Sequence, residues 1–146
     1  MTDELAAFLR ARLDEDERFA ARLGDRRFTL VPIDPHAGPV DGQQRGMVDV
    51  VTAEDGSIAL FRHPMFAEHF TRQGPARVLR DIEARRALVF EHADEGGDCR
   101  VCARPSNETN ELGYAFHEPL PYPCRTVRLL ALPYADHPDY REEWRP

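Results

Sequence analysis

The sequence predicts a small α+β protein, and three observations carry that prediction. Two segments, residues 2–23 and 75–92, place apolar residues at helical spacing. Three short runs rich in β-forming residues lie between them, within residues 28–61. A histidine and three cysteines in the last third of the chain have the spacing of a metal site. We therefore expect an N-terminal helix, an antiparallel sheet of about three strands, a long central helix, a zinc knuckle and a short C-terminal helix.

The length and composition predict one domain. A chain of 146 residues falls within the usual size of a single domain, and 42% hydrophobic residues suffice to bury a core. We expect residues 1–146 to form one unit, with the N-terminal helix in 1–24, the sheet in 28–61, further helices in 64–92 and the zinc-binding part in 92–146.

The net charge of −7 argues against binding to nucleic acids or anionic membranes, because phosphate-rich surfaces repel an acidic protein. No apolar stretch approaches the roughly 18 residues of a membrane span, and the N-terminus lacks the layout of a secretory signal. We expect a cytoplasmic protein whose cysteines stay reduced. An odd count of three cysteines also favours metal binding over a disulfide framework.

The first helix is predicted over residues 2–23. Thr2 is suited to cap its start, and Gly24 is the residue type that ends helices in a left-handed conformation. Its apolar stripe consists of Leu5, Phe8, Leu9, Leu13, Ala20 and Leu23. We interpret this stripe as part of the core, and a partner-binding or dimerising helix is the alternative.

The middle of the chain predicts a small sheet followed by two helices. Residues 28–33 form an edge strand, because Pro32 cannot donate a ladder hydrogen bond. Residues 47–51 and 57–61 form a hairpin whose turn signal is an Asp-Gly pair, and residues 34–46 have the composition of a loop. Pro64 then starts a short helix, and Pro75 starts the long helix that ends near residue 92.

Four residues form the predicted metal site: His92, Cys99, Cys102 and Cys124. The Cys-x2-Cys spacing allows one tight turn to present two thiolates to a zinc ion, which takes four N or S ligands in a tetrahedron. Cys124 begins the short C-terminal helix, where a thiolate is stabilised. His92 ends the long helix and completes a Cys3His set. We predict a structural Zn²⁺ and no catalytic residues.

Other interpretations of these residues stay open. His117 is the rival fourth ligand, and it lies within residues 103–123, which we interpret as a loop inserted between the halves of the site. The cysteines can instead be free thiols or a redox pair, although Cys99 does not stand at the helix start that a thioredoxin-type pair requires. The zinc deaminase pattern fails, because it needs a Glu after the histidine and a proline before Cys-x2-Cys.

The number of ligands decides between a structural and a catalytic metal. Four protein ligands leave no position at the zinc for water or substrate, which disfavours catalysis there. With three protein ligands one position would be open, and a catalytic metal would be favoured instead. We interpret His63 and His69 as capping or packing residues, because their spacing of six places them on different faces of a helix. The segment around His137 suggests either an acid–base cluster or a turn that starts a helical segment, and we favour the turn.

Three segments carry a family resemblance: LAAFLRARLDEDER, PARVLRDIEARRALVFEH and PCRTVRLLALPYADHPDYREEWRP. Together with the Cys-x2-Cys they resemble an uncharacterised family of short proteins from actinobacteria and their phages, a domain of unknown function. The resemblance implies no reaction, and it implies that His92, Cys99, Cys102 and Cys124 occupy matching metal-type positions. The strand region and the segment before Cys124 match no family pattern.

These observations favour a zinc-stabilised binding or adaptor module that is associated with phage or prophage and has a protein partner. The acidic charge and the four-ligand site support this interpretation. One alternative is a nucleic-acid-associated regulator that uses Arg77, Arg80, Arg85 and Arg86 on the long helix. The other is a small zinc or thiol enzyme with an open metal position.

Overall fold

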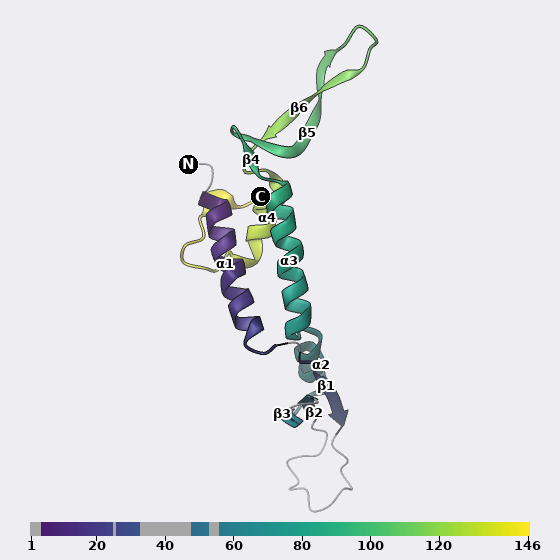
Figure 1. The fold of residues 1–146 in the computed structure, drawn as a ribbon, viewed down its shortest axis with the longest axis vertical. Coiled ribbons are helices and arrows are strands. Elements are labelled where there is room, and N and C mark those ends of the chain that lie inside the picture. Colours follow the sequence, from purple (N-terminus) through teal and green to yellow (C-terminus); the bar gives the residue numbers. More distant parts are fainter. Residues whose placement is uncertain (1–3, 25, 33–47, 53–55) are drawn as a thin grey trace, which may run out of the picture. The chain divides into compact units, whose positions relative to one another are not determined.

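The α+β architecture is confirmed by a computed structural model, which describes residues 4–24, 26–32, 48–52 and 56–146 (Figure 1). The chain divides into two compact units. One consists of residues 16–81, and the other of residues 1–15 together with residues 82–146. Helices α1 (Glu4–Ala21) and α3 (Pro75–Glu91) each supply residues to both units. Folding as one cooperative domain stays a prediction.

The predicted N-terminal helix is confirmed as α1, and its first half supplies much of the larger unit's core. Leu5, Leu9 and Leu13 are each 1% exposed. Gly24 has a φ of 65°, so the left-handed residue after the helix is also confirmed. The proposed cap at Thr2 lies outside the described residues. Leu23, which we assigned to the buried stripe, is exposed.

Helix α4 (Arg125–Ala131) closes the other side of this core. Its Val127 and Ala131 are fully buried in one cluster with Leu5, Leu9 and Val89. Two 3-10 turns, Leu132–Tyr134 and Glu142–Trp144, then carry the chain back towards α1. Together these elements form the helical layer beside which the metal-type residues lie.

Aromatic residues fix the C-terminal segment on α1. The ring of Phe8 contacts the rings of Tyr134, His137, Tyr140 and Trp144 edge-on or tilted. His137 also contacts the guanidinium of Arg12. The His137 N–H donates to the Tyr134 carbonyl and its carbonyl accepts from the Tyr140 N–H, each at 2.9 Å, which agrees with the turn that we predicted at this position.

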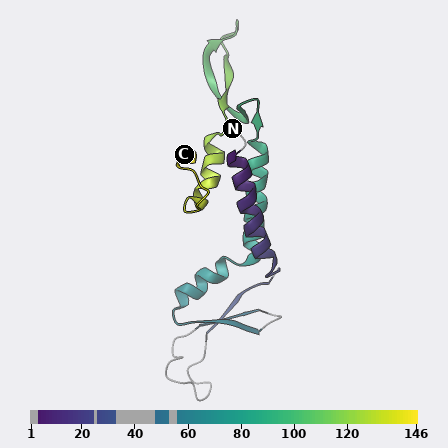
Figure 2. The same cartoon turned by 90° about the vertical axis from the view of Figure 1, so that its left-hand side faces the viewer.

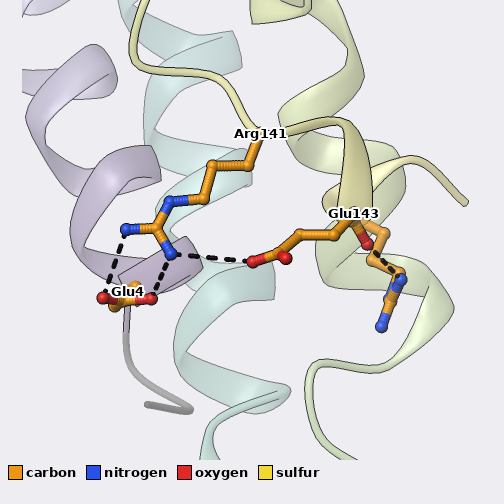
Figure 3. A network of polar contacts seen from close by, with 4 residues as sticks. Glu4, Arg141 and Glu143 are labelled. Atoms are coloured by element: carbon orange, nitrogen blue, oxygen red, sulfur yellow. Dashed lines mark hydrogen bonds and ion pairs between the residues drawn. The ribbon is translucent and has the colours of Figure 1, made fainter.

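An ion pair joins the start of α1 to the same segment (Figure 3). The Arg141 guanidinium donates to both carboxylate oxygens of Glu4, at 2.6 and 3.2 Å, and lies 3.6 Å from the Glu143 carboxylate. The pKa of Arg141 is raised, chiefly by its hydrogen bond to Glu4. This pair is exposed to solvent, so the aromatic packing beneath it contributes more to stability.

The smaller unit contains the predicted antiparallel sheet. Strands β1 (Thr29–Pro32), β2 (Val48–Thr52) and β3 (Gly56–Phe61) pair in the order β1-β2-β3, which confirms β1 as an edge strand. Helix α2 (Pro64–Arg72) lies against the sheet, and its Ala67 is buried with Val50 (Figure 2). The predicted loop 34–46 and the turn residues 53–55 lie outside the described residues.

The prediction that residues 103–123 form a loop is wrong. Strands β5 (Asp98–Thr109) and β6 (Ala115–Pro121) form a long hairpin there, with the two-residue strand β4 (Asp94–Glu95) at the base of β5. The prolines of this segment misled the sequence interpretation, because a ribbon with open edges tolerates residues that cannot donate. Asn110 and Gly113 supplied the missed turn signal. The Asn110 side chain accepts from the N–H groups of Leu112 and Tyr114, and Gly113 has a φ of 81°.

Candidate metal centre

The four predicted ligands come from three elements of one unit. His92 is the first residue after α3, and its N–H donates to the Leu88 carbonyl at 3.0 Å, which continues the helical pattern. Cys99 and Cys102 lie near the start of β5. Cys124 is the N-cap residue of α4, which confirms that it stands at the start of the short C-terminal helix.

Two glycines turn the chain from α3 into the cysteine pair. Gly96 and Gly97 have φ values of 72° and 100°, a conformation that L side chains rarely adopt. The Asp94 carboxylate accepts from the Gly97 N–H at 2.7 Å and stabilises this turn. The tight turn that we predicted at the cysteines therefore lies just before them.

A bulge in β5 presents the two cysteines. Asp98 pairs with Pro121 and Ala103 with Pro119, so four residues of β5 lie opposite a single residue of β6. Extra residues in one strand leave the ladder and bend the strand locally. The Cys-x2-Cys segment occupies this bulge, which frees both side chains to face His92 and Cys124.

The side-chain atoms of the four residues converge on one point. The Nδ1 atom of His92 lies 3.4 Å from the Sγ of Cys99, 3.3 Å from that of Cys102 and 3.5 Å from that of Cys124. All four potential ligand atoms lie within 4.8 Å of one another. A tetrahedron with Zn–S bonds of about 2.3 Å and Zn–N bonds of about 2.0 Å has N–S edges of about 3.5 Å. The three measured distances are therefore close to the edges that a zinc ion would require.

The local environment favours a thiolate at Cys99. Burial raises the pKa of this thiol, but hydrogen bonds from the backbone N–H groups of Val101 and Cys102 outweigh burial and lower the pKa to about 7. Burial, followed by the neighbouring Cys99 and Cys124, raises the pKa of Cys102 to about 12. Like-charged thiolates cannot gather in one place without a compensating cation, and a bound metal ion supplies that charge.

The cluster is continuous with the hydrophobic core of its unit. Cys99 and Cys124 are 3% and 4% exposed and pack in the same buried cluster as Leu5, Phe8 and Val127. Cys102 is partly buried and packs against that cluster. Helices α1 and α4 and the base of the hairpin therefore meet at the metal-type residues.

The other candidate residues lie elsewhere. His117, the rival ligand, is exposed on β6 opposite Pro105 and is not part of the cluster. His63 is the N-cap residue of α2, and His69 lies within α2. Within the described residues, the His92 group is the one arrangement of three or more His, Cys, Asp or Glu residues that suits a metal ion.

The fold and the cluster define a class of protein: a small α+β protein with a His-Cys-Cys-Cys group that could hold a metal ion. The chain belongs to a family of unknown function (DUF6221), whose model matches residues 2–146. No curated protein and no solved structure matches the chain. The match confirms the resemblance to a domain of unknown function. It also includes the strand region and the segment before Cys124, for which we had expected no family pattern.

No helix in the described part of the chain is both long and apolar enough to cross a membrane.

Proposed function

We propose that His92, Cys99, Cys102 and Cys124 bind one Zn²⁺ ion that stabilises the fold. The observation that carries this proposal is the near-equal distance of His92 Nδ1 from three cysteine sulfurs, 3.3–3.5 Å. Thiolate and imidazole ligands in a tetrahedral arrangement are typical of zinc. Other thiophilic metals fit the same donor set, so metal analysis is the decisive test.

A structural role for the zinc follows from the ligand count and from burial. Four protein ligands fill a tetrahedral shell and leave no position for a substrate. The ligands also join elements that are distant in sequence, because 32 residues separate Cys124 from His92. Binding free energy that depends on the folded arrangement becomes folding free energy.

The β5–β6 hairpin supports an adaptor function with a protein partner. Val101, Leu112, Tyr114 and Phe116 are large apolar residues of this hairpin and its tip, and each is more than half exposed. Aromatic side chains that remain exposed on a protruding ribbon are suited to a protein interface, since burying them on binding is favourable. The zinc site would anchor the base of the hairpin, while its far end would meet the partner.

The setting of this adaptor is also a proposal. A metal site of three cysteines fits the cytoplasm, where thiols stay reduced. The phage or prophage association rests on the family resemblance alone. The enzyme alternative requires an open position at the metal, and the regulator alternative requires a basic face on α3. Arg86, one of the four α3 arginines that this regulator alternative uses, pairs with Asp14 at 2.5 Å, and this pairing makes a continuous basic face on α3 less favourable.

The first experiment is elemental analysis of the untagged protein, together with X-ray absorption at the zinc edge. One zinc per chain with three sulfurs and one nitrogen would support the structural site. An oxygen in the shell would favour the enzyme alternative, and a chain purified without metal that also fails to take up zinc would refute the proposal.

The partner surface is tested with a photo-crosslinking residue at position 112 in cells of the native host. We expect crosslinks that are lost when Tyr114 and Phe116 are replaced by Ser. Replacing Phe19 and Phe66, which are 69% and 57% exposed and lie outside the hairpin, serves as the matched control. Equal loss in both variants would contradict a role of the hairpin.

A further inference from the structure

A pocket in the smaller unit gathers positive charge in an otherwise acidic protein. Its volume is about 440 Å³, and it lies where α2 ends, α3 begins and the chain enters β1. Its lining includes Arg26, Arg27, Arg72, Arg77 and Arg80 and no acidic residue of the described chain. We call these five residues the arginine pocket. The whole chain carries a net charge of −7, so this concentration of guanidinium groups is opposite in sign to the average surface.

Three of the five side chains are held by the surrounding backbone or by one carboxylate. The Arg77 guanidinium donates to the Arg72 carbonyl at 3.2 Å, and that of Arg26 donates to the Leu23 carbonyl at 2.6 Å. Arg72 pairs with Glu68 at 2.5 Å. These contacts position guanidinium groups around the pocket.

The other two arginines have no such partner. Among residues 4–24, 26–32, 48–52 and 56–146, neither Arg27 nor Arg80 forms a hydrogen bond or an ion pair. Arg80 lies three residues after Arg77, so both side chains project from one face of α3. Like charges at this distance repel one another, and an anion in the pocket would relieve that repulsion.

The start of α3 adds to the same field. Gly74 and Ala76 line the pocket at the first turn of this 17-residue helix. The N–H groups of Arg77 and Val78 both donate to the Gly74 carbonyl, so what favours an anion at this position is the positive end of the helix dipole. The arginines of the pocket, and not the helix start by itself, are the observation that points to an anion here.

We propose that the arginine pocket binds a small phosphate ester with several negative charges, such as a nucleoside polyphosphate. The planar guanidinium group matches phosphate oxygens with two parallel hydrogen bonds. A volume of about 440 Å³ suits a ligand of nucleotide size. A long nucleic acid fits less well. Salt screens the charge of the pocket beyond a Debye length of roughly 8 Å, and past that distance the nucleic acid would meet the acidic remainder of the surface.

The test is isothermal titration calorimetry of the full, zinc-loaded chain with ATP and with inorganic pyrophosphate at low ionic strength. We expect both probes to bind, and the Arg27→Gln/Arg80→Gln variant to weaken binding by about tenfold or more, since charge-assisted hydrogen bonds are lost. Tighter binding of ATP than of pyrophosphate would assign part of the recognition to the nucleoside.

The matched control is Arg62→Gln/Arg125→Gln, which removes the same charge from exposed positions outside the pocket. We expect it to bind both probes as the unmodified protein does. Equal weakening in the two double variants, or no binding of either probe at millimolar concentration, would overturn the proposal. Binding of an oligothymidylate that pyrophosphate fails to displace would overturn it in favour of a nucleic-acid site.

Discussion

At the scale of single residues, the metal-type cluster depends on where four side chains point. His92 supplies the one nitrogen, and its Nδ1 atom faces all three sulfurs at 3.3–3.5 Å. His117 has the same chemistry but is exposed on β6, away from the cluster. The chemistry of the residue type therefore does not distinguish the two histidines, whereas their positions do.

Replacing each histidine by alanine tests this difference. We expect His92→Ala to weaken zinc binding by more than about 100-fold, because losing a direct ligand costs more than losing an outer partner. His117→Ala serves as the control and should bind zinc as the unmodified protein does. Competition with a chromogenic chelator measures both affinities, and the reverse result would place the fourth ligand on the hairpin.

The glycine turn before the cysteines gives a second test at this scale. Gly97→Ala should cost about 1–2 kcal/mol of unfolding free energy, because a Cβ is disfavoured at a positive φ. It should also lower zinc affinity, since the turn positions Cys99. Gly113→Ala imposes a similar backbone cost at the hairpin tip, where φ is 81°. Calorimetric melting measures the stability of both variants, and chelator competition measures their zinc affinity. An equal loss of zinc affinity in the two variants would contradict this account.

At the scale of elements, α1 shows how a predicted apolar stripe is used. Leu5 and Leu9 are almost fully buried in one cluster with residues of α3, α4 and the cysteine group. Leu13 is 1% exposed, whereas Phe19 is 69% exposed. The first half of the helix is therefore a core element, which leaves little of that stripe for a dimer interface.

Truncating side chains of α1 tests whether its first half belongs to the core. We expect Leu9→Ala to lower the free energy of unfolding by about 2–5 kcal/mol, because it removes buried methyl groups and leaves a cavity. Phe19→Ala should change it by less than about 0.5 kcal/mol, as is typical of exposed sites. Denaturant unfolding measures both values. A small effect of Leu9→Ala with dissociation of an oligomer would instead support the dimerising helix.

At the scale of the whole molecule, the two compact units differ in how their cores are held. Residues 82–146 with residues 1–15 share their core with the cysteine cluster, while residues 16–81 pack a small sheet against α2. A metal ion at the cluster would therefore act directly on the first unit. The second unit has its own buried residues, including Val50 and Ala67.

Removing the metal tests this division of roles. We expect a strong chelator to lower the melting temperature and to abolish amide protection first in β5, α4 and the end of α3, because zinc binding contributes to folding there. Strands β2 and β3 should lose less protection. Hydrogen exchange read by mass spectrometry makes the comparison, and an unchanged exchange pattern after complete zinc removal would contradict a structural metal.

Unfolding of the zinc-loaded chain tests the single-domain prediction. We expect one calorimetric transition, because α1 and α3 each continue from one unit into the other. Two separate transitions would instead indicate that the units fold independently.

Local features of the sequence determined most of the secondary structure and the chemistry of the site. Helical spacing predicted α1 and α3, proline marked the edge strand β1, and Cys-x2-Cys with Cys124 and His92 supplied the donor set. These signals act over a few residues, so they can be recognised without a tertiary structure.

Only the tertiary structure decided which side chains meet. The convergence of His92 with Cys124 closes 32 residues of chain and depends on packing against the core. The β5–β6 hairpin escaped prediction because long-range pairing outweighed its prolines. The arginine pocket likewise joins residues from three segments of the chain. Sequence patterns determine the local preferences and donor types, whereas cooperative packing determines the distances on which binding depends.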